Sequence, residues 1–149
     1  MLIISHGDPR DPQAQALLHS SHALMLDLFP AEDNYALEID DLLTPDIRFF
    51  IAREGPQVLG TGALAIREGY GEVKSMFTDK GARGKGVAAA LLRQIEDEAR
   101  SHDLTMLKLE TGEALSEAIR LYQRHGFARC ERFGDYAVNQ TSVYMEKHL

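Results

Sequence analysis

Glycines and cations alternate in the segment Gly81-Ala82-Arg83-Gly84-Lys85-Gly86-Val87-Ala88. Glycine lets neighbouring backbone N–H groups point into one concavity and lets a ligand approach the chain closely. The segment precedes an expected helix, whose first N–H groups have no internal partner and whose dipole favours an anion. Arg83 and Lys85 add positive charge, which a plain connector does not need. The segment therefore predicts a site for the diphosphate of a nucleotide cofactor.

Two other phosphate loops compete for this segment. The Walker pattern requires a glycine, four residues and then Gly-Lys-Ser/Thr, whereas here Gly84-Lys85 is followed by Gly86 and position 79 is aspartate. A dinucleotide fingerprint is formally present as Gly84-x-Gly86-x-x-Ala89. That fold runs its strand almost directly into the first glycine, but here several residues intervene. An NAD site stays open as the minor alternative.

The elements around the loop alternate between strand and helix. Segments rich in β-branched and apolar residues, bounded by glycine turns, predict an antiparallel meander before the loop. A long helix with one apolar face follows the loop, so the strands on its two sides are expected to be parallel. The predicted strands are 2–5, 47–52, 58–66, 72–78, 104–110, 127–132 and 142–147, and the predicted helices are 12–28, 40–43, 86–102 and one around Tyr122.

Tyr122 is the aromatic residue in this last helix whose position is most informative. Leu115, Ala118, Ile119 and Tyr122 have the i, i+3, i+4, i+7 spacing of one buried helix face. Tyr122 is therefore expected to point inward. On periodicity alone, a core tyrosine with a satisfied hydroxyl is the favoured interpretation.

Composition and charge restrict the class of protein. The chain of 149 residues has the size of one domain, residues 1–149, of mixed α and β structure. Its net charge of −7 argues against broad nucleic-acid binding, and no apolar run approaches the ~20 residues of a membrane span. Cys130 is the sole cysteine, which excludes a cysteine metal cluster and favours a reducing cytoplasm. His19 and His22 alone do not complete a metal site.

Two segments resemble the GNAT superfamily of acyl-CoA N-acyltransferases. The segment Arg83-Gly84-Lys85-Gly86-Val87-Ala88 is similar to the family's Gln/Arg-x-x-Gly-x-Gly/Ala pattern, read as Arg-x-x-Gly-x-Ala. The segment from Ala118 to Phe127 is similar to the family's Ala-x-x-Leu-Tyr-x-x-x-Gly-Phe. The order and spacing of the two also match, over a resemblance that runs from Ile47 to the C-terminus. Further details resemble the bacterial YsnE-like subgroup, at 71–76, 109–112 and 139–145.

The resemblance implies a fold and an activity. The fold would be a single α+β domain, with a mixed central sheet, an antiparallel N-terminal meander, a strand–loop–helix–strand crossover for coenzyme A and flanking helices. The activity would be acetyl-CoA-dependent N-acetyl transfer to a primary amine of a small molecule, amino acid or peptide, without a metal. A non-catalytic acyl-CoA-binding module is the alternative from another class, and a homodimer is a further expectation that the sequence leaves open.

Site residues follow from the same resemblance. Tyr122 would be the general acid for the leaving thiolate. Glu72 would be the general base, with Glu110 or a chain of water molecules as open alternatives. The oxyanion donor would be a backbone N–H near Met76 or Phe77. Cofactor contacts would come from Met76, Phe77, Thr78, Arg83, Gly84, Lys85, Gly86, Val87, Ala88 and Ala89.

The acceptor side is less defined. The acidic segment 33–46 is expected near the mouth of the acceptor site, and Tyr136 and Asn139 are further candidates for its lining. One departure from the family concerns Leu115, which stands where many members have asparagine. Any polar contact of that asparagine must therefore be absent or come from another residue.

Overall fold

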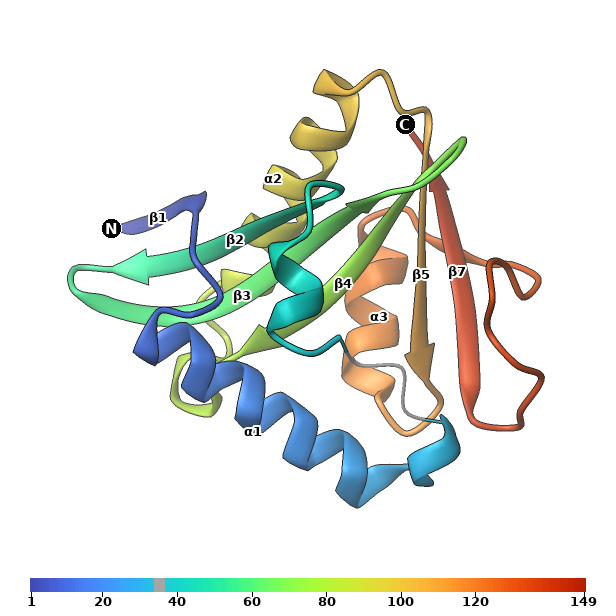
Figure 1. The fold of residues 1–149 in the computed structure, drawn as a ribbon, viewed down its shortest axis with the longest axis horizontal. Helices are drawn as coiled ribbons and strands as arrows, with labels where there is room; N and C mark the ends of the chain where they lie inside the picture. The colour runs from blue at the N-terminus through green and yellow to red at the C-terminus, as the bar shows by residue number, and fades with distance from the viewer. Residues whose placement is uncertain (34–36) are drawn as a thin grey trace.

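The sheet at the centre of the protein has seven strands in the order β1-β2-β3-β4-β5-β7-β6 (Figure 1). The computed structural model describes residues 1–33 and 37–149. Neighbouring strands among these residues are antiparallel except β4 and β5, which are parallel. The strands are β1 Leu2–His6, β2 Ile47–Glu54, β3 Gln57–Ile66, β4 Gly71–Thr78, β5 Met106–Gly112, β6 Ala128–Arg129 and β7 Ser142–His148. The α-helices are α1 Pro12–Leu28, α2 Val87–Ser101 and α3 Ser116–Arg124, with short 3₁₀ helices η1 Ala31–Asp33, η2 Asp40–Leu43 and η3 Lys80–Ala82.

Helix α1 covers part of one face of the sheet. Its first turn is capped by Asp11, whose carboxylate accepts hydrogen bonds from the N–H groups of Gln13 at 3.0 Å and Ala14 at 3.2 Å. Its inward side chains pack with η2 and with apolar residues of β2 and β3. In the described part of the chain this cluster takes no residue from β5 or β7. Helix α1 therefore covers the β2 and β3 part of this face, and its C-cap Phe29 reaches the end of β5, at Gly112.

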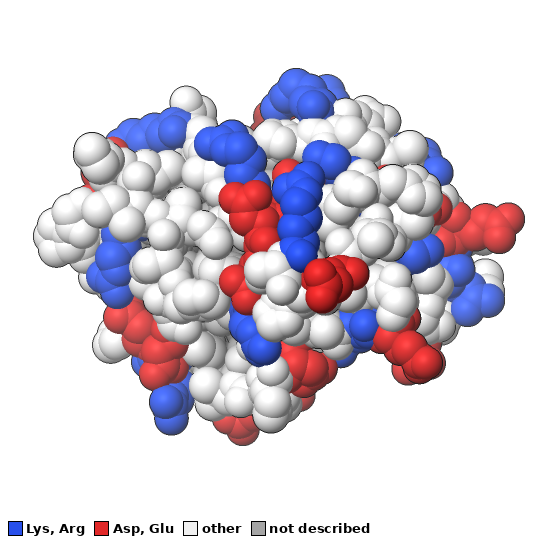
Figure 2. Space-filling model, turned by 90° about the horizontal axis from the view of Figure 1, so that it is seen from above, with Lys and Arg blue, Asp and Glu red and all other residues white. Residues whose placement is uncertain are grey.

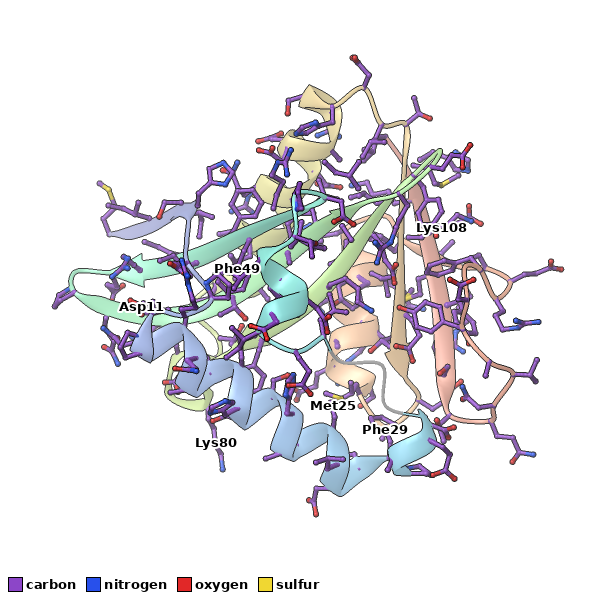
Figure 3. The ribbon with its side chains drawn as sticks, in the orientation of Figure 1. Asp11, Met25, Phe29, Phe49, Lys80 and Lys108 are labelled. Atoms are coloured by element: carbon purple, nitrogen blue, oxygen red, sulfur yellow. The ribbon has the colours of Figure 1, made fainter. Side chains whose placement is uncertain are left out.

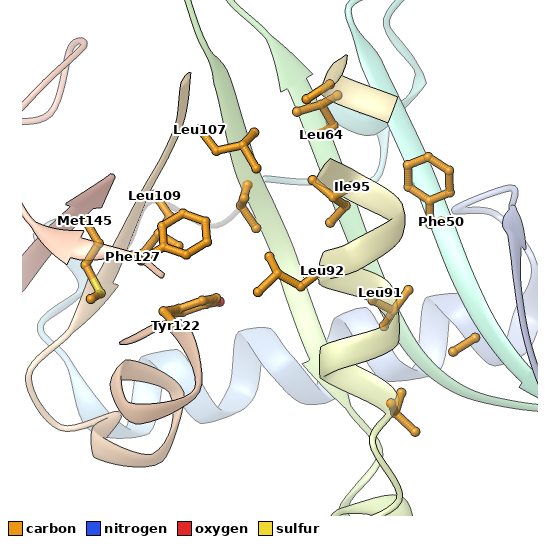
Figure 4. Close-up of a cluster of buried hydrophobic side chains, with 14 of the residues drawn as sticks. Phe50, Leu64, Leu91, Leu92, Ile95, Leu107, Leu109, Tyr122, Phe127 and Met145 are labelled. Atoms are coloured by element: carbon orange, nitrogen blue, oxygen red, sulfur yellow. The ribbon is translucent and has the colours of Figure 1, made fainter. Parts of the chain in front are cut away.

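Helices α2 and α3 lie on the opposite face and build the larger core (Figures 1 and 4). Leu91, Leu92 and Ile95 from α2 are fully buried against the sheet. Tyr122 and Ile119 from α3 pack against the other half of the same cluster. Since Leu107 and Leu109 of β5 point into this core, the alternate residues Lys108 and Glu110 face the side of α1.

A bulge interrupts β4. The β3–β4 register pairs Thr61 with Phe77 but Ala63 with Lys74, so β4 holds an extra residue between these pairs. Ser75 lies there with a positive φ of 54°, and its carbonyl oxygen accepts a hydrogen bond of 2.8 Å from the Thr61 hydroxyl. The bulge redirects the second half of β4 away from a regular ladder.

Strands β4 and β5 separate after a short contact. Their parallel pairing covers Gly71 with Leu107 and Glu72 with Lys108. Beyond these pairs, no register between the two strands is formed in the described chain, and the strands diverge (Figure 1). The sheet is therefore split where the β4 bulge lies, and the backbone edge of β4 from Val73 to Thr78 borders the opening.

Most predicted elements are confirmed, with shifts at their ends. The predicted strand 127–132 was too long, since β6 covers only Ala128–Arg129. After the N–H of Cys130 bonds to the Tyr144 carbonyl oxygen at 2.9 Å, the chain leaves the sheet and returns as β7. The predicted helix 86–102 begins one residue later, because Gly86 is its N-cap with a positive φ. None of the described helices is long and apolar enough to cross a membrane.

Replacement of Gly60 by alanine is expected to lower the free energy of unfolding by about 1–3 kcal/mol. A Cβ at Gly60 would lie 2.6 Å from Val87 Cγ1 and 3.0 Å from the Phe77 carbonyl oxygen. Val87 is β-branched and buried, and the carbonyl belongs to the sheet, so neither atom moves easily. Chemical denaturation measures the loss. Gly81→Ala is the control, because its Cβ would meet only Asp79 Oδ2 at 3.4 Å; equal stability of the two variants would contradict this close packing.

Candidate active site

The predicted phosphate loop lies between η3 and the N-terminus of α2. Gly84 and Gly86 have φ values of 87° and 78°, the left-handed region that glycine adopts without strain. No side chain caps α2. Arg83 and Lys85 are exposed beside its first turn, and Lys85 Nζ lies 3.7 Å from Glu54 Oε1 at the surface. The loop thus presents two cations and an uncapped helix N-terminus, an arrangement that binds anions.

The remaining predicted cofactor residues lie on both sides of this loop. Val87, Ala88 and Ala89 form the first turn of α2, whose N–H groups lack partners within the helix. Val87 is buried, so only its backbone is available to a ligand. Met76 and Phe77 are half-buried in the last part of β4, past the bulge. With Thr78 they continue the open edge of β4 toward the loop.

A cavity of about 140 Å³ occupies the split between β4 and β5. Its lining comes from four parts of the fold: α1 and the segment after it, β4, β5 with α3, and the residue just before β7. Met25 and Phe29 lie at the C-terminal end of α1 (Figure 3), at one end of this cavity. The lining residues are Leu18, Ser21, His22, Met25, Phe29, Asp33, Leu37, Val73, Lys74, Ser75, Met76, Glu110, Thr111, Gly112, Leu115, Ala118, Tyr122 and Thr141.

Tyr122 reaches this cavity from α3. The residue is only 7% exposed, and its ring packs edge-to-face on Phe127 with 5.7 Å between the ring centroids (Figure 4). Burial raises the pKa of the Tyr122 hydroxyl to about 12, because the phenolate would lose its hydration. Tyr122 therefore stays protonated at neutral pH. The inward orientation predicted from the helical spacing is confirmed.

Glu72 belongs to a different group of side chains. Its carboxylate has Arg67 Nε at 3.4 Å from Oε1 and Lys74 Nζ at 3.5 Å from Oε2. The Tyr136 hydroxyl donates a hydrogen bond to Oε2 and accepts one of 2.7 Å from Lys74. Burial, followed by the charge of Glu72, raises the pKa of Tyr136 and keeps it a donor. Glu72 thus lies in a network of two cations and a phenol.

This network lines a second cavity, of about 410 Å³. The second cavity is bounded by Arg67, Tyr70, Glu72, Lys74, Gly134, Asp135 and Tyr136. Lys74 lines both cavities, whereas Tyr122 lines the first and Glu72 the second. The two predicted catalytic side chains are therefore placed on different sides of Lys74.

Glu110 lines the same cavity as Tyr122. Burial raises the pKa of this carboxyl, while a 2.7 Å hydrogen bond that the Ser142 hydroxyl donates to Oε2 and the charge of Lys74 lower it. Asn139 Nδ2 in turn donates to the Ser142 hydroxyl at 3.0 Å. A half-buried carboxyl whose pKa is raised above its ordinary value is suited to proton transfer.

Other lining residues were not indicated by the sequence. The wall formed by α1 comes from the other end of the chain, and its apolar spacing signals only a packed helix. Asp33 was predicted only as part of the acidic segment 33–46, of which residues 34–36 lie outside the described part of the chain. Leu115, the departure from the family pattern, lines the cavity with an apolar side chain. No group of three potential metal-ligating side chains occurs among the described residues.

Charge on the outer surface is mixed. On the face shown in Figure 2, acidic and basic side chains are interspersed. Ion pairs between elements contribute to this pattern, among them Arg48 Nε with Glu98 Oε2 at 3.7 Å and Arg67 Nη1 with Asp46 Oδ2 at 3.1 Å. The two loop cations Arg83 and Lys85 are therefore a local feature of an acidic protein.

Comparison with protein families gives a match to the acetyltransferase (GNAT) family over residues 14–127, most of the chain. The chain belongs to the GNAT family. It is 43% identical to the IAA acetyltransferase of Azospirillum brasilense over 98% of this chain and 97% of that protein. It is 40% identical to the N-acetyltransferase YsnE of Bacillus subtilis (strain 168), over 86% of each chain. The crystal structure of an acyl-CoA N-acyltransferase from Klebsiella pneumoniae superposes with a TM-score of 0.86, at 31% identity over 100% of this chain and 98% of that one.

The GNAT assignment confirms three predictions. The family and its YsnE-like resemblance are correct, the fold is the GNAT fold, and the protein is an acyltransferase of the N-acetyltransferase type. GNAT enzymes use acetyl-CoA and act on amine acceptors. The parallel sheet that a dinucleotide-binding fold requires is not formed, because β4 and β5 are the sole parallel pair among the described strands.

Proposed function

We propose that this GNAT enzyme transfers an acetyl group from acetyl-CoA to a primary amine of a small molecule, amino acid or peptide. The observation that carries the proposal is the cavity in the β4–β5 split, which a buried phenol, Tyr122, and a half-buried carboxyl, Glu110, both line. A proton donor and a proton acceptor in one cavity are what amide formation from a thioester and an amine requires. The anion-binding loop lies at the end of the same split.

Coenzyme A fits the residues around the split. The loop offers Arg83, Lys85 and the free N–H groups of the α2 N-terminus to a diphosphate. The open edge of β4, from Met76 to Thr78, offers backbone groups to an extended amide-containing arm, in the way that an unpaired strand edge binds a peptide. Acetyl-CoA would supply the activated acetyl group. The oxyanion of the tetrahedral intermediate would be held by a backbone N–H near Met76 or Phe77.

The proposed base is Glu110 rather than Glu72. An amine with a pKa near 10 is only about one part in a thousand neutral at pH 7, so the site must take a proton. Glu110 lines the Tyr122 cavity and has a raised pKa. Glu72 lies outside that cavity, where its carboxylate is engaged by Arg67, Lys74 and the Tyr136 hydroxyl. Glu72 stays the second candidate, and a water chain the third.

Two side chains, Glu110 and Tyr122, carry out the proton transfers that this reaction requires. Glu110 takes one proton from the acceptor ammonium, and the free amine attacks the thioester carbonyl to form the N–C bond of a tetrahedral intermediate with a negative oxygen and a positive nitrogen. As this intermediate collapses the C–S bond breaks, Tyr122 donates its proton to the leaving sulfur, and the positive nitrogen returns a proton to Tyr122 and becomes the amide nitrogen. The products are the N-acetylated acceptor, free coenzyme A and one proton released from Glu110 to water.

Two measurements test the proposal. Isothermal titration is expected to show coenzyme A binding, and NAD is expected not to compete with it. Release of free thiol from acetyl-CoA is then measured over a panel of amines, amino acids and short peptides, with IAA included because the Azospirillum relative is named for it. Absence of coenzyme A binding overturns the proposal. Binding without thiol release for any acceptor favours the non-catalytic module instead.

Removal of either loop cation is expected to weaken coenzyme A binding by about tenfold, the loss of one charge-assisted hydrogen bond to a phosphate. The variants are Arg83→Ala and Lys85→Ala, and the effect is expected to shrink at high salt because both side chains are exposed. Arg100→Ala is the matched control, since Arg100 is an exposed cation at the other end of α2. Titration calorimetry measures all three. Equal affinity of the loop variants and the wild type would remove the loop as the phosphate site.

The location and the assembly of the enzyme remain predictions. A cytoplasmic location rests on the single cysteine, Cys130. A homodimer is an expectation that light scattering of the purified protein tests directly.

A further inference from the structure

One wall of the Tyr122 cavity is apolar. Leu18, Met25 and Phe29 come from α1 and its C-cap, and Leu37 and Leu115 are further apolar residues of the cavity lining. The Phe29 ring lies directly on the backbone of Gly112 at the end of β5, which closes this end of the cavity with an aromatic surface. An acceptor that enters here meets hydrocarbon on this side.

Two carboxylates also line this cavity. The Thr141 hydroxyl donates a hydrogen bond of 3.0 Å to Asp33 Oδ2, and the neighbouring Ser142 hydroxyl donates one of 2.7 Å to Glu110 Oε2. Asn139 Oδ1 accepts from the N–H groups of both Thr141 and Ser142, at 2.9 Å and 2.8 Å. The turn at residues 139–142 therefore hydrogen-bonds both Asp33 and Glu110, and both of these acids line the cavity.

The charges that face this cavity sum to a negative value. Lys74 is the one cation among the described lining residues, and its ammonium already pairs with Glu72 at 3.5 Å and donates to Tyr136. His22 contributes a ring nitrogen, Nε2, which lies 3.0 Å from the Leu37 carbonyl oxygen. A carboxylate on the acceptor would therefore lie near the carboxylates of Asp33 and Glu110. The ammonium of Lys74, the one cation of the described lining, is already neutralised by Glu72.

The volume of the cavity indicates the size of the apolar group. At about 140 Å³ it is close to that of an engineered protein cavity of ~150 Å³ that binds benzene. A phenyl ring or a branched alkyl group of similar size therefore matches the volume of this cavity.

We propose that the acceptor is a primary amine that carries an uncharged apolar group of about the size of a phenyl ring, and that a carboxylate beside the amine is selected against. This inference rests on the proposed function and names the acceptor class for it. Asp33 binds the acceptor ammonium, Glu110 takes its proton, and the wall of α1 packs on the apolar group. The class excludes free α-amino acids from the preferred acceptors.

A matched set of three acceptors tests this class. 2-Phenylethylamine, phenylalaninol and phenylalanine share the ring and the amine, but only phenylalanine adds a carboxylate. The kcat/KM for thiol release is expected to be at least about tenfold lower for phenylalanine than for either compound without a carboxylate. The reason is that the phenylalanine carboxylate would be repelled by Asp33 and Glu110 in a partly buried site. Equal or higher kcat/KM for phenylalanine overturns the class. Coenzyme A binding with no thiol release for all three compounds overturns it as well.

A variant of Asp33 tests whether this carboxylate binds the acceptor ammonium and selects against phenylalanine. Asp33→Asn is expected to lower kcat/KM for 2-phenylethylamine by about tenfold and to narrow the ratio between this amine and phenylalanine. Asp27→Asn is the control, since Asp27 is an exposed acid on α1 outside the cavity lining and its change alters the net charge equally. An unchanged ratio in Asp33→Asn assigns no role to Asp33. Titration with coenzyme A, run on each protein, separates failure of this class from failure of the proposed acetyl transfer.

Discussion

Tyr122→Phe is expected to lower kcat by about 10²- to 10⁴-fold, the usual contribution of a general acid. The affinity for coenzyme A is expected to change little. Phenylalanine fills the same space among Leu92, Leu109 and Phe127, so the core and the cofactor loop stay in place (Figure 4). What the variant removes is the proton for the leaving sulfur. Steady-state kinetics and titration calorimetry on the same preparation separate kcat from binding.

The pH profile adds a second check on this tyrosine. Because burial raises its pKa to about 12, Tyr122 stays protonated over the whole range of an ordinary assay, and no basic limb in kcat is expected from its ionisation below that value. Tyr70→Phe is the matched control, since Tyr70 lines the second cavity and not the first. A kcat that is unchanged in Tyr122→Phe, or a loss that appears equally in coenzyme A affinity, would reject Tyr122 as the acid.

Glu110→Gln is expected to lower kcat/KM by about 10²-fold or more near neutral pH, with little change in stability. Glutamine retains an oxygen that accepts the Ser142 hydrogen bond, so the β5–β7 contact survives. Only the carboxylate form of Glu110 takes a proton, and its pKa is raised by burial. Activity of the wild type is therefore expected to fall as the pH drops through a value above the ordinary ~4.3 of a glutamate. This acidic limb is expected to vanish in Glu110→Gln.

Glu72→Gln, measured beside Glu110→Gln, decides between the two acids as the base. Its carboxylate neutralises Arg67 and Lys74 in a buried network, and loss of one partner of a buried ion pair costs about 3 kcal/mol. The expected defect is a lower free energy of unfolding, with kcat/KM per folded molecule largely retained. Denaturant unfolding and kinetics are measured on both variants. If Glu72→Gln abolishes activity while folded, and Glu110→Gln does not, then Glu72 is the base.

The phosphate loop and the orientation of Tyr122 were predictable because both depend on neighbours in sequence. Two positive-φ glycines, two cations and a helix start lie within a few residues, and the local backbone alone decides their arrangement. The inward position of Tyr122 follows from the period of one helix. The meander and the parallel crossover follow from glycine turns and one long amphipathic helix.

The overlong strand at 127–132 shows where local pattern stops being sufficient. Its residues have strand-like character, yet pairing with β7 ends after Arg129. The chain then leaves the sheet and places Tyr136 over Glu72, a contact between residues 64 positions apart. The spacing of residues within either segment does not indicate a hydrogen bond to a partner so distant in sequence.

The residues alone determined the family, the fold and the loop that suits a diphosphate. The tertiary structure decided which acid shares a cavity with Tyr122. Glu72 and Glu110 stand on the neighbouring strands β4 and β5, and the sequence predicts Glu72 as the base with Glu110 as its alternative. In the folded protein Glu110 lines the cavity of Tyr122, Glu72 lines the second cavity, and Lys74 lines both. Tertiary packing decides which cations lie within a few ångströms of a carboxylate. The distance between a cation and a carboxylate in turn affects how readily the carboxylate takes a proton.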